Sequence, residues 1–172
     1  MINKVSENIW QLEFERFGSC VYILKLEGKI IIIDTGALWN RSELKDDFKE
    51  LEINLEDVEI VILTHNHFDH IGNVSVFKNA KVYGGKDDFS KKDVLNIDEL
   101  VIKEFKIIKT PGHSRGSFCI YMPKKKILFS GDTLFEVGVG RTDLPGSEPD
   151  KIKESLDILY KLDVDILCPG HV

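Results

Sequence analysis

The chain has 172 residues, of which 42% are hydrophobic and 30% are charged, and its formal net charge is −6 at pH 7. These proportions are typical of a folded globular protein, and the acidic charge argues against a nucleic-acid partner, whose phosphates are neutralised by Lys and Arg. The apolar runs are far shorter than the ~20 residues of a membrane span, and the first residues contain no apolar signal segment, so we expect a cytoplasmic protein without a membrane partner.

The first third of the chain predicts β-strands, followed by a helix and one further strand. Runs rich in β-branched and aromatic residues predict strands at residues 9–14, 20–26, 29–33 and 58–63. The helix lies before the last of these runs, because Leu44, Phe48 and Leu51 repeat at helical spacing, and Ser42 is its expected N-cap. The last run is almost entirely apolar, which suits a strand buried on both faces.

The rest of the chain predicts more strands and a second helix. Strand-like runs lie at residues 81–83, 101–108, 118–122, 126–129 and 163–168. Ser147 and Pro149 indicate a helix start, and the buried face of that helix is expected to carry Ile152, Leu156, Leu159 and Tyr160. Strands with helices between and after them predict a layered α/β protein with mixed sheets, and we expect a single domain over residues 1–172.

The three cysteines are far apart and form no C-x-x-C pair. Cys20 and Cys119 lie in strand-like apolar runs, and Cys168 ends the last predicted strand. We therefore expect all three to be reduced thiols in or near the core.

Four potential metal ligands follow directly on the strand at 58–63, in Thr64-His65-Asn66-His67-Phe68-Asp69-His70. His65, His67 and Asp69 alternate, so an extended backbone projects all three to one side, and a turn can aim His70 at a neighbouring point. Four ligands in six residues cannot all serve one tetrahedral ion. They suit two adjacent ions, each completed from elsewhere in the chain.

Three further candidate ligands lie in turns at the ends of predicted strands. They are His113, Asp132 and His171, and each directly follows a glycine that lets the backbone bend sharply. Loops at strand ends are where a rigid scaffold presents functional groups. Every histidine of the chain lies in such a turn, and this concentration predicts a metal site rather than ordinary surface or core histidines.

The H-x-H-x-D-H motif, with Asp34-Thr35-Gly36 before it and the later turns after it, resembles the metallo-β-lactamase fold hydrolases over nearly the whole chain. The resemblance implies a four-layer αββα sandwich with two mixed sheets, and it places Asp34 next to the site without binding metal. It implies a first metal bound by His65, His67 and His113, a second bound by Asp69, His70 and His171, and Asp132 as the bridge between them.

Within this family, the stretch from Gly131 to Asp143 resembles glyoxalase II and its persulfide dioxygenase relatives. Arg141 falls where glyoxalase II has a basic residue that binds the glutathione part of the substrate, whereas Asp143 replaces a tyrosine. A salt bridge between Arg141 and Asp143 is the alternative role for that arginine. The additional C-terminal helical domain of glyoxalase II is not expected here.

The resemblance implies an enzyme that cleaves a thioester or similar acyl compound of small size. Two zinc ions would turn a bridging water into a hydroxide nucleophile, and Asp69 would orient it and carry its proton. The alternative is a persulfide dioxygenase with one iron held by His65, His113 and Asp132. Two further alternatives are hydrolysis of a lactam or lactone, and a module that binds metal in a closed site without catalysis.

Overall fold

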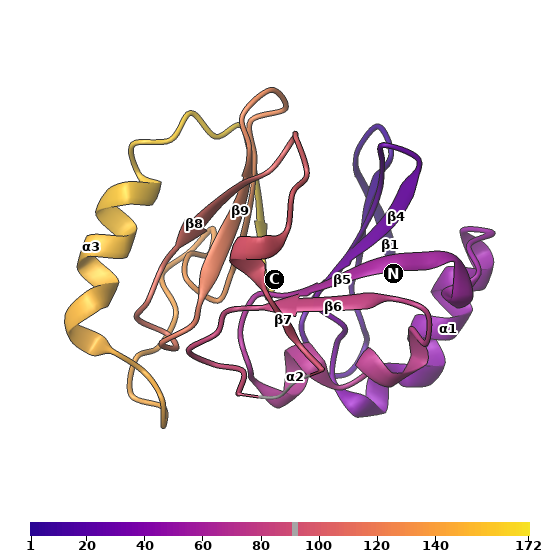
Figure 1. Cartoon of the computed structure of the whole chain (residues 1–172), viewed down its shortest axis with the longest axis horizontal. Coiled ribbons are helices and arrows are strands. Elements are labelled where there is room, and N and C mark those ends of the chain that lie inside the picture. Colours follow the sequence, from indigo (N-terminus) through magenta and orange to yellow (C-terminus); the bar gives the residue numbers. More distant parts are fainter. Residues whose placement is uncertain (91–92) are drawn as a thin grey trace. The chain divides into compact units, whose positions relative to one another are not determined.

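The structure is a computed structural model that describes residues 1–90 and 93–172 (Figure 1). The helices of the described residues are α1 (Arg41–Glu50), α2 (Phe68–Ile71) and α3 (Pro149–Leu159). The strands are β1 (Ile2–Ser6), β2 (Ile9–Leu12), β3 (Val21–Leu26), β4 (Lys29–Ile33), β5 (Val58–Leu63), β6 (Lys81–Gly84), β7 (Leu95–Asn96), β8 (Lys106–Lys109), β9 (Phe118–Met122), β10 (Ile127–Gly131) and β11 (Ile166–Pro169).

Over the described residues the strands form two mixed sheets. One has seven strands in the order β1-β2-β3-β4-β5-β6-β7, and the other has four strands in the order β11-β10-β9-β8. The same residues divide into two compact units: unit 1 contains Met1–Leu63 and His67–Tyr83, and unit 2 contains Thr64–Asn66 and Gly84–Val172. The H-x-H-x-D-H motif is therefore shared between them, with His65 in unit 2 and His67 to His70 in unit 1.

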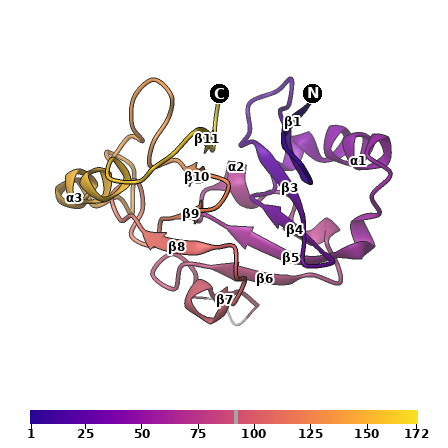
Figure 2. The ribbon, with the colours of Figure 1, turned by 90° about the horizontal axis from the view of Figure 1, so that it is seen from above.

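Unit 1 is built on an antiparallel meander of β1 to β4, to which β5 is added in parallel (Figure 2). The consecutive isoleucines of β4 explain its central position, because Ile31, Ile32 and Ile33 are all buried. The parallel β4–β5 connection runs through α1, which buries Leu44 and Phe48. Both strands end at the same edge of the sheet, and candidate site residues follow each of them in the sequence.

The structure of unit 1 differs from the sequence-based expectation in three details. Helix α1 begins after Asn40 and not after Ser42, because a 3₁₀ turn at Leu38–Asn40 leads directly into it. The motif is extended at His67 but becomes helical at Phe68–Ile71, so the expected extended alternation does not reach Asp69. Strand β1, which was not predicted, adds an outer strand beside β2.

Unit 2 is built on the four-stranded sheet and on α3, which lies beside β8 and β9 in Figure 1. Strand β9 is antiparallel to both β8 and β10, and β10 is parallel to β11. Three strands of this sheet, β8, β10 and β11, therefore run in the same direction. The helix packs through Leu159 on a core made by Ile108, Cys119, Tyr121 and Leu128.

Several predicted boundaries in unit 2 were also wrong. The strand expected at 101–108 is only Lys106–Lys109, because Val101 is 86% exposed and the chain turns just before Lys106. Tyr160 is 64% exposed, since it follows the last residue of α3 and faces solvent. Ser147 does not cap α3, because the N-cap is Glu148 and the Ser147 hydroxyl binds elsewhere.

The prediction for the cysteines is confirmed. Cys20, Cys119 and Cys168 are all buried and none forms a disulfide. Burial raises the pKa of the Cys119 thiol to about 11, which keeps it protonated. Across the two described ranges, 1–90 and 93–172, no helix is long and apolar enough to cross a membrane.

Candidate metal centre

In unit 2, three predicted ligands emerge at the same edge of the four-stranded sheet. His113 follows β8, Asp132 follows β10 directly, and His171 follows β11. Because these three strands run in the same direction, their carboxyl ends share one edge. The backbone locks the last two together, since Gly170 N–H donates to the Gly131 carbonyl at 2.8 Å.

The side chains at this edge converge on the Asp132 carboxylate. Its Oδ2 lies 3.4 Å from Nε2 of His113 and 3.5 Å from Nε2 of His171. A ligand atom of His65, also in unit 2, lies within 4.8 Å of a ligand atom of Asp132 and of one of His113. The rings of His65 and His113 meet edge to face, with centroids 4.8 Å apart. Unit 2 thus brings together four of the predicted metal ligands.

The backbone fixes the orientation of the His113 ring. Its Nδ1 lies 2.7 Å from the carbonyl oxygen of Arg141, which can only accept a hydrogen bond. Nδ1 therefore carries a hydrogen atom, and Nε2 faces Oδ2 of Asp132 at 3.4 Å, where a proton or a metal ion can bridge the two atoms.

The distances around Asp132 fit a metal ion. Atoms bound to one tetrahedral zinc at about 2.0–2.2 Å lie about 3.3–3.6 Å from one another. The two Nε2 to Oδ2 distances of 3.4 and 3.5 Å fall in that range. Both histidines approach the same oxygen, Oδ2, from loops that follow different strands, which is compatible with a carboxylate that binds metal.

In unit 1, the ring of His70 is held through its Nδ1, as the ring of His113 is in unit 2. Its Nδ1 donates to Oδ2 of Asp34 at 2.8 Å, and the two side chains are almost completely buried. Asp34 directly follows β4 and has a left-handed backbone with φ of 56°. A carboxylate on Nδ1 fixes the tautomer and orientation of an imidazole whose Nε2 is the metal ligand. The expected place of Asp34 beside the ligands is consistent with this contact.

The turn around Asp34 also anchors helix α2. Thr35 donates its backbone N–H and its hydroxyl to the His70 carbonyl, at 2.7 and 2.8 Å. The Asn73 side chain donates to the carbonyls of Thr35 and Ala37, at 2.9 and 2.7 Å. These contacts hold α2 against the ends of β4 and β5, so the His70 ring is fixed from both its backbone and its side chain.

The remaining ligands of the motif are His67 and Asp69, which both belong to unit 1. His67 is the N-cap of α2 and is half-buried, and Asp69 is buried in its first turn. A carboxylate oxygen of Asp69 lies within 4.8 Å of a ring nitrogen of His70. Within unit 1, Asp69 and His70 therefore lie close enough together to meet one ion.

Arg141 is placed differently from a substrate-binding cation. Its guanidinium binds the Asp143 carboxylate through two hydrogen bonds of 2.8 and 2.7 Å, and both side chains are exposed. The hydrogen bonds from Arg141 hold the pKa of Asp143 at about 2, so the carboxylate stays ionised. Of the two roles expected for Arg141, the structure favours the ion pair that shapes the loop.

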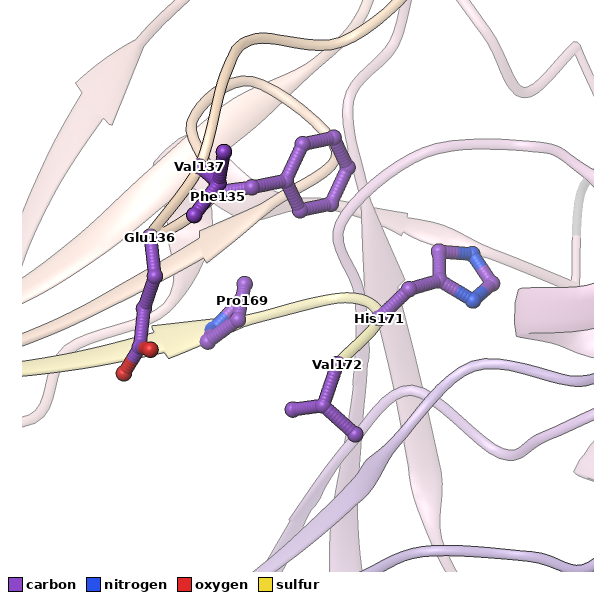
Figure 3. Close-up of a pocket in the computed structure, with 6 residues that line it drawn as sticks. All are labelled: Phe135, Glu136, Val137, Pro169, His171 and Val172. Carbon is purple, nitrogen blue, oxygen red and sulfur yellow. The ribbon is translucent and has the colours of Figure 1, made fainter.

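A cavity of about 410 Å³ opens beside His171 (Figure 3). It is lined by Phe135, Glu136, Val137, Pro169, His171 and Val172. The rings of Phe135 and His171 lie next to each other in Figure 3, with centroids 6.4 Å apart. The walls are mainly apolar, and Glu136 is the acidic side chain among them. A small apolar group fits this cavity better than an anionic one.

Two residues that orient the ligands were not identified from the sequence. The Arg141 carbonyl fixes His113, and the Ser147 hydroxyl donates to the His113 carbonyl at 2.8 Å. The first contact uses only the backbone, so no side-chain pattern signals it. The second is made by a serine whose position before α3 is typical of a helix cap.

Comparison with known proteins points to one family. The sequence pattern of the Metallo-beta-lactamase superfamily matches residues 14–86 and 83–171. A hydroxyacylglutathione hydrolase of Francisella tularensis subsp. novicida is 32% identical over 160 residues, which are 87% of this chain and 61% of that protein. The hydroxyacylglutathione hydrolase of an Enterobacter species is also 32% identical, over 83% of this chain and 57% of its own length. The chain thus spans about three fifths of the length of these two relatives.

Solved structures show the same fold. TTHA1623 in a di-iron-bound form superposes with a TM-score of 0.82 and 26% identity, over 94% of this chain and 91% of its own. ETHE1 from Myxococcus xanthus gives a TM-score of 0.77 and 25% identity, over 94% and 74%. The B3 metallo-β-lactamase BLEG-1 gives 0.73 and 27%, over 95% and 91%. The predicted α/β fold with two mixed sheets is confirmed, and the chain belongs to the metallo-β-lactamase superfamily.

Proposed function

We propose that this chain is a metal-dependent hydrolase that binds two metal ions and cleaves a thioester or a similar acyl compound. The observation that carries the proposal is the Asp132 carboxylate, which faces Nε2 of His113 at 3.4 Å and Nε2 of His171 at 3.5 Å. A carboxylate between two imidazoles is the donor set of a bridged pair of ions.

The ligands divide between the two ions as follows. The first ion is assigned to His65, His67 and His113, the second to Asp69, His70 and His171, and Asp132 is assigned to both. Three observations support this division. His65 and His67 are separated by a single residue, Asp69 and His70 are paired within unit 1, and both His70 and His113 hold their Nδ1 atoms on acceptors, which leaves Nε2 for coordination.

The protein residues supply orientation and proton transfer. Two zinc ions held by these residues would lower the pKa of a water toward neutrality and would polarise the substrate carbonyl. Asp69 is the carboxylate assigned to accept the proton of the attacking water. Asp34 and the Arg141 carbonyl hold His70 and His113 in the required tautomers. No serine nucleophile is needed.

The cavity beside His171 suggests the kind of substrate. Its walls are apolar except for Glu136 and His171 itself, and Arg141, the basic residue expected to bind glutathione, is paired with Asp143. A thioester with an apolar acyl or thiol part fits these features better than a glutathione conjugate with its free carboxylates. The hydroxyacylglutathione hydrolases named above support the thioester class.

A mononuclear iron dioxygenase is the second candidate, and one observation favours it. His65, His113 and Asp132, two histidines and one carboxylate, all lie in unit 2 with their ligand atoms within 4.8 Å of one another. Such a triad is typical of non-haem iron oxygenases. The fold likeness to TTHA1623, which was solved in a di-iron-bound form, makes iron the alternative to zinc.

The test is to load chelator-treated protein with zinc or with iron and to follow two reactions. Acyl thioesters of increasing chain length and S-lactoylglutathione are offered for hydrolysis, and glutathione persulfide is offered with an oxygen electrode. The proposal expects hydrolysis by the zinc form without oxygen uptake. Oxygen uptake by the iron form with no hydrolysis by either form would establish the dioxygenase instead.

Matched variants connect the activity to the site. We expect His65→Ala and Asp132→Ala each to abolish turnover and to reduce bound metal, because each removes a ligand. The control is Asp157→Asn, which removes one carboxylate charge from an exposed position on α3. Unchanged metal content and turnover in His65→Ala or Asp132→Ala would contradict the assignment.

A further inference from the structure

We propose that Asp88 is a positioning residue of the metal centre, which ties the segment that carries His65 to the loop that carries His113. The inference rests on the proposed metal centre and goes beyond its ligands. All the contacts that support it lie within unit 2, and Asp88 itself is half-buried in the loop after β6.

The Asp88 carboxylate accepts three hydrogen bonds from two separate segments. Its Oδ2 accepts from the Ser114 hydroxyl at 2.6 Å and from the Asn66 backbone N–H at 3.2 Å. Its Oδ1 accepts from the Gly116 backbone N–H at 2.7 Å. The Asp88 carbonyl accepts a further bond from the Asn66 side chain at 3.0 Å. A short turn, with Asp88 N–H on the Gly85 carbonyl at 3.0 Å, presents the carboxylate.

Both segments are directly joined to metal ligands. Asn66 follows His65 and precedes His67, and Ser114 follows His113. Hydrogen bonds to an ionised carboxylate are roughly twice as strong as bonds between neutral groups. One side chain therefore sets the distance between the backbone that carries His65 and the backbone that carries His113.

The loop that carries Asp88 packs closely against the loop that carries Gly116. A Cβ placed on Gly116 would lie 2.7 Å from both Cγ and the backbone nitrogen of Asp88. A Cβ on Gly85 would lie 2.0 Å from the Gly116 carbonyl oxygen. The Ser114 hydroxyl is held a second time by the Ser117 hydroxyl at 2.6 Å. The glycines thus allow a close approach of the loops, and Asp88 fixes it.

The expected consequence is a loss of metal affinity without a loss of substrate affinity. Partners that orient metal ligands typically change metal affinity by roughly 10- to 100-fold when they are removed. Asp88→Ala removes all three carboxylate bonds, whereas Asp88→Asn keeps one oxygen acceptor and turns an amide toward a donor. We expect the dissociation constant for zinc to rise by about 10-fold or more for Ala and by less for Asn.

The experiment measures zinc binding by competition with a coloured chelator for the wild-type chain, Asp88→Asn, Asp88→Ala and Ser114→Ala. Asp87→Asn is the control. Asp87 directly precedes Asp88 and its side chain is exposed, so this variant removes the same charge without removing the hydrogen bonds of Asp88. We expect the control to bind zinc as the wild type does and Ser114→Ala to weaken binding less than Asp88→Ala. At saturating zinc, KM for a thioester should be unchanged in the Asp88 variants, whereas a lower kcat is allowed.

The outcomes separate this inference from the proposed function. Zinc affinities of the Asp88 variants within about twofold of the wild type would overturn the positioning role, and so would an equal loss in Asp87→Asn. If Asp88→Ala does not fold, Asp88→Asn and Ser114→Ala decide by the same criterion. A wild-type chain that binds neither zinc nor iron contradicts the metal centre itself, and the role of Asp88 with it.

Discussion

Replacement of Asp34 by alanine is expected to destabilise the protein through two separate effects. The variant loses the hydrogen bond of 2.8 Å from the buried His70 ring, and bonds to charged groups contribute about 1.5–3 kcal/mol. It also places alanine at a φ of 56°, where a Cβ costs roughly 1–2 kcal/mol in a residue that lacks a polar side chain. Together they predict a loss of about 2.5–5 kcal/mol in the free energy of unfolding.

Two further variants separate these effects. Asp34→Asn keeps an oxygen acceptor for His70 and tolerates the left-handed backbone, so we expect a loss of only about 1 kcal/mol. Asp34→Gly removes the hydrogen bond but relieves the backbone, and should fall between the other two. The zinc affinity should fall to a similar extent in the alanine and glycine variants and less in Asp34→Asn, because only the first two remove the partner that orients His70.

The assay is urea denaturation of chelator-treated protein, followed by a zinc titration of each variant. If Asp34→Ala lowers the free energy of unfolding by less than about 1 kcal/mol and leaves zinc affinity unchanged, the contact with His70 does not hold the ring. Equal losses in the glycine and alanine variants would instead refute the contribution of the backbone.

Three other predictions concern separate parts of unit 2. The pKa of Asp143 is about 2, below its usual ~3.9, so the pair with Arg141 is complete above about pH 4 and is lost only as the pH falls toward 2. Because Arg141 is bound to Asp143 and is not assigned to the substrate, Asp143→Asn should leave KM for an apolar thioester unchanged at pH 7; a several-fold change in KM would show that Arg141 faces the substrate. Gly140→Ala should displace Asp132 and so reduce the bound metal, because its Cβ would lie 1.7 Å from the Asp132 carbonyl oxygen. Elemental analysis measures the metal, and full metal content would contradict this steric argument. Cys119, with its pKa raised to about 11 by burial, should resist iodoacetamide at pH 8 until the protein is unfolded, and rapid labelling of folded protein followed by mass spectrometry would contradict its burial.

The sequence was sufficient for the strands that consist of a continuous apolar run. Strands β5 and β9 have the predicted bounds, because every alternative placement would expose isoleucine, valine or phenylalanine. It was insufficient at 101–108, where apolar residues also occur in an exposed turn, so that only Lys106–Lys109 pairs with a neighbouring strand. It also missed the helical turn in the motif, which depends on the distant Thr35 and its bonds to the His70 carbonyl.

The candidate ligands could be identified because metal binding needs a few residue types in a recognisable order. The residues that orient those ligands could not. Asp88 is one of many acidic residues on the chain, and only the fold brings its carboxylate to Asn66 and Ser114. The Arg141 carbonyl acts through the backbone, which is the same for every amino acid except proline in its hydrogen-bonding groups.

The most direct test of the two-metal centre is a crystal structure of zinc-loaded protein with an anomalous difference map at the zinc edge. We expect two peaks on either side of the Asp132 carboxylate. The first should be bound by His65, His67 and His113, and the second by Asp69, His70 and His171. A single peak, or peaks bound by other side chains, in protein that hydrolyses thioesters at full rate would contradict the two-metal centre.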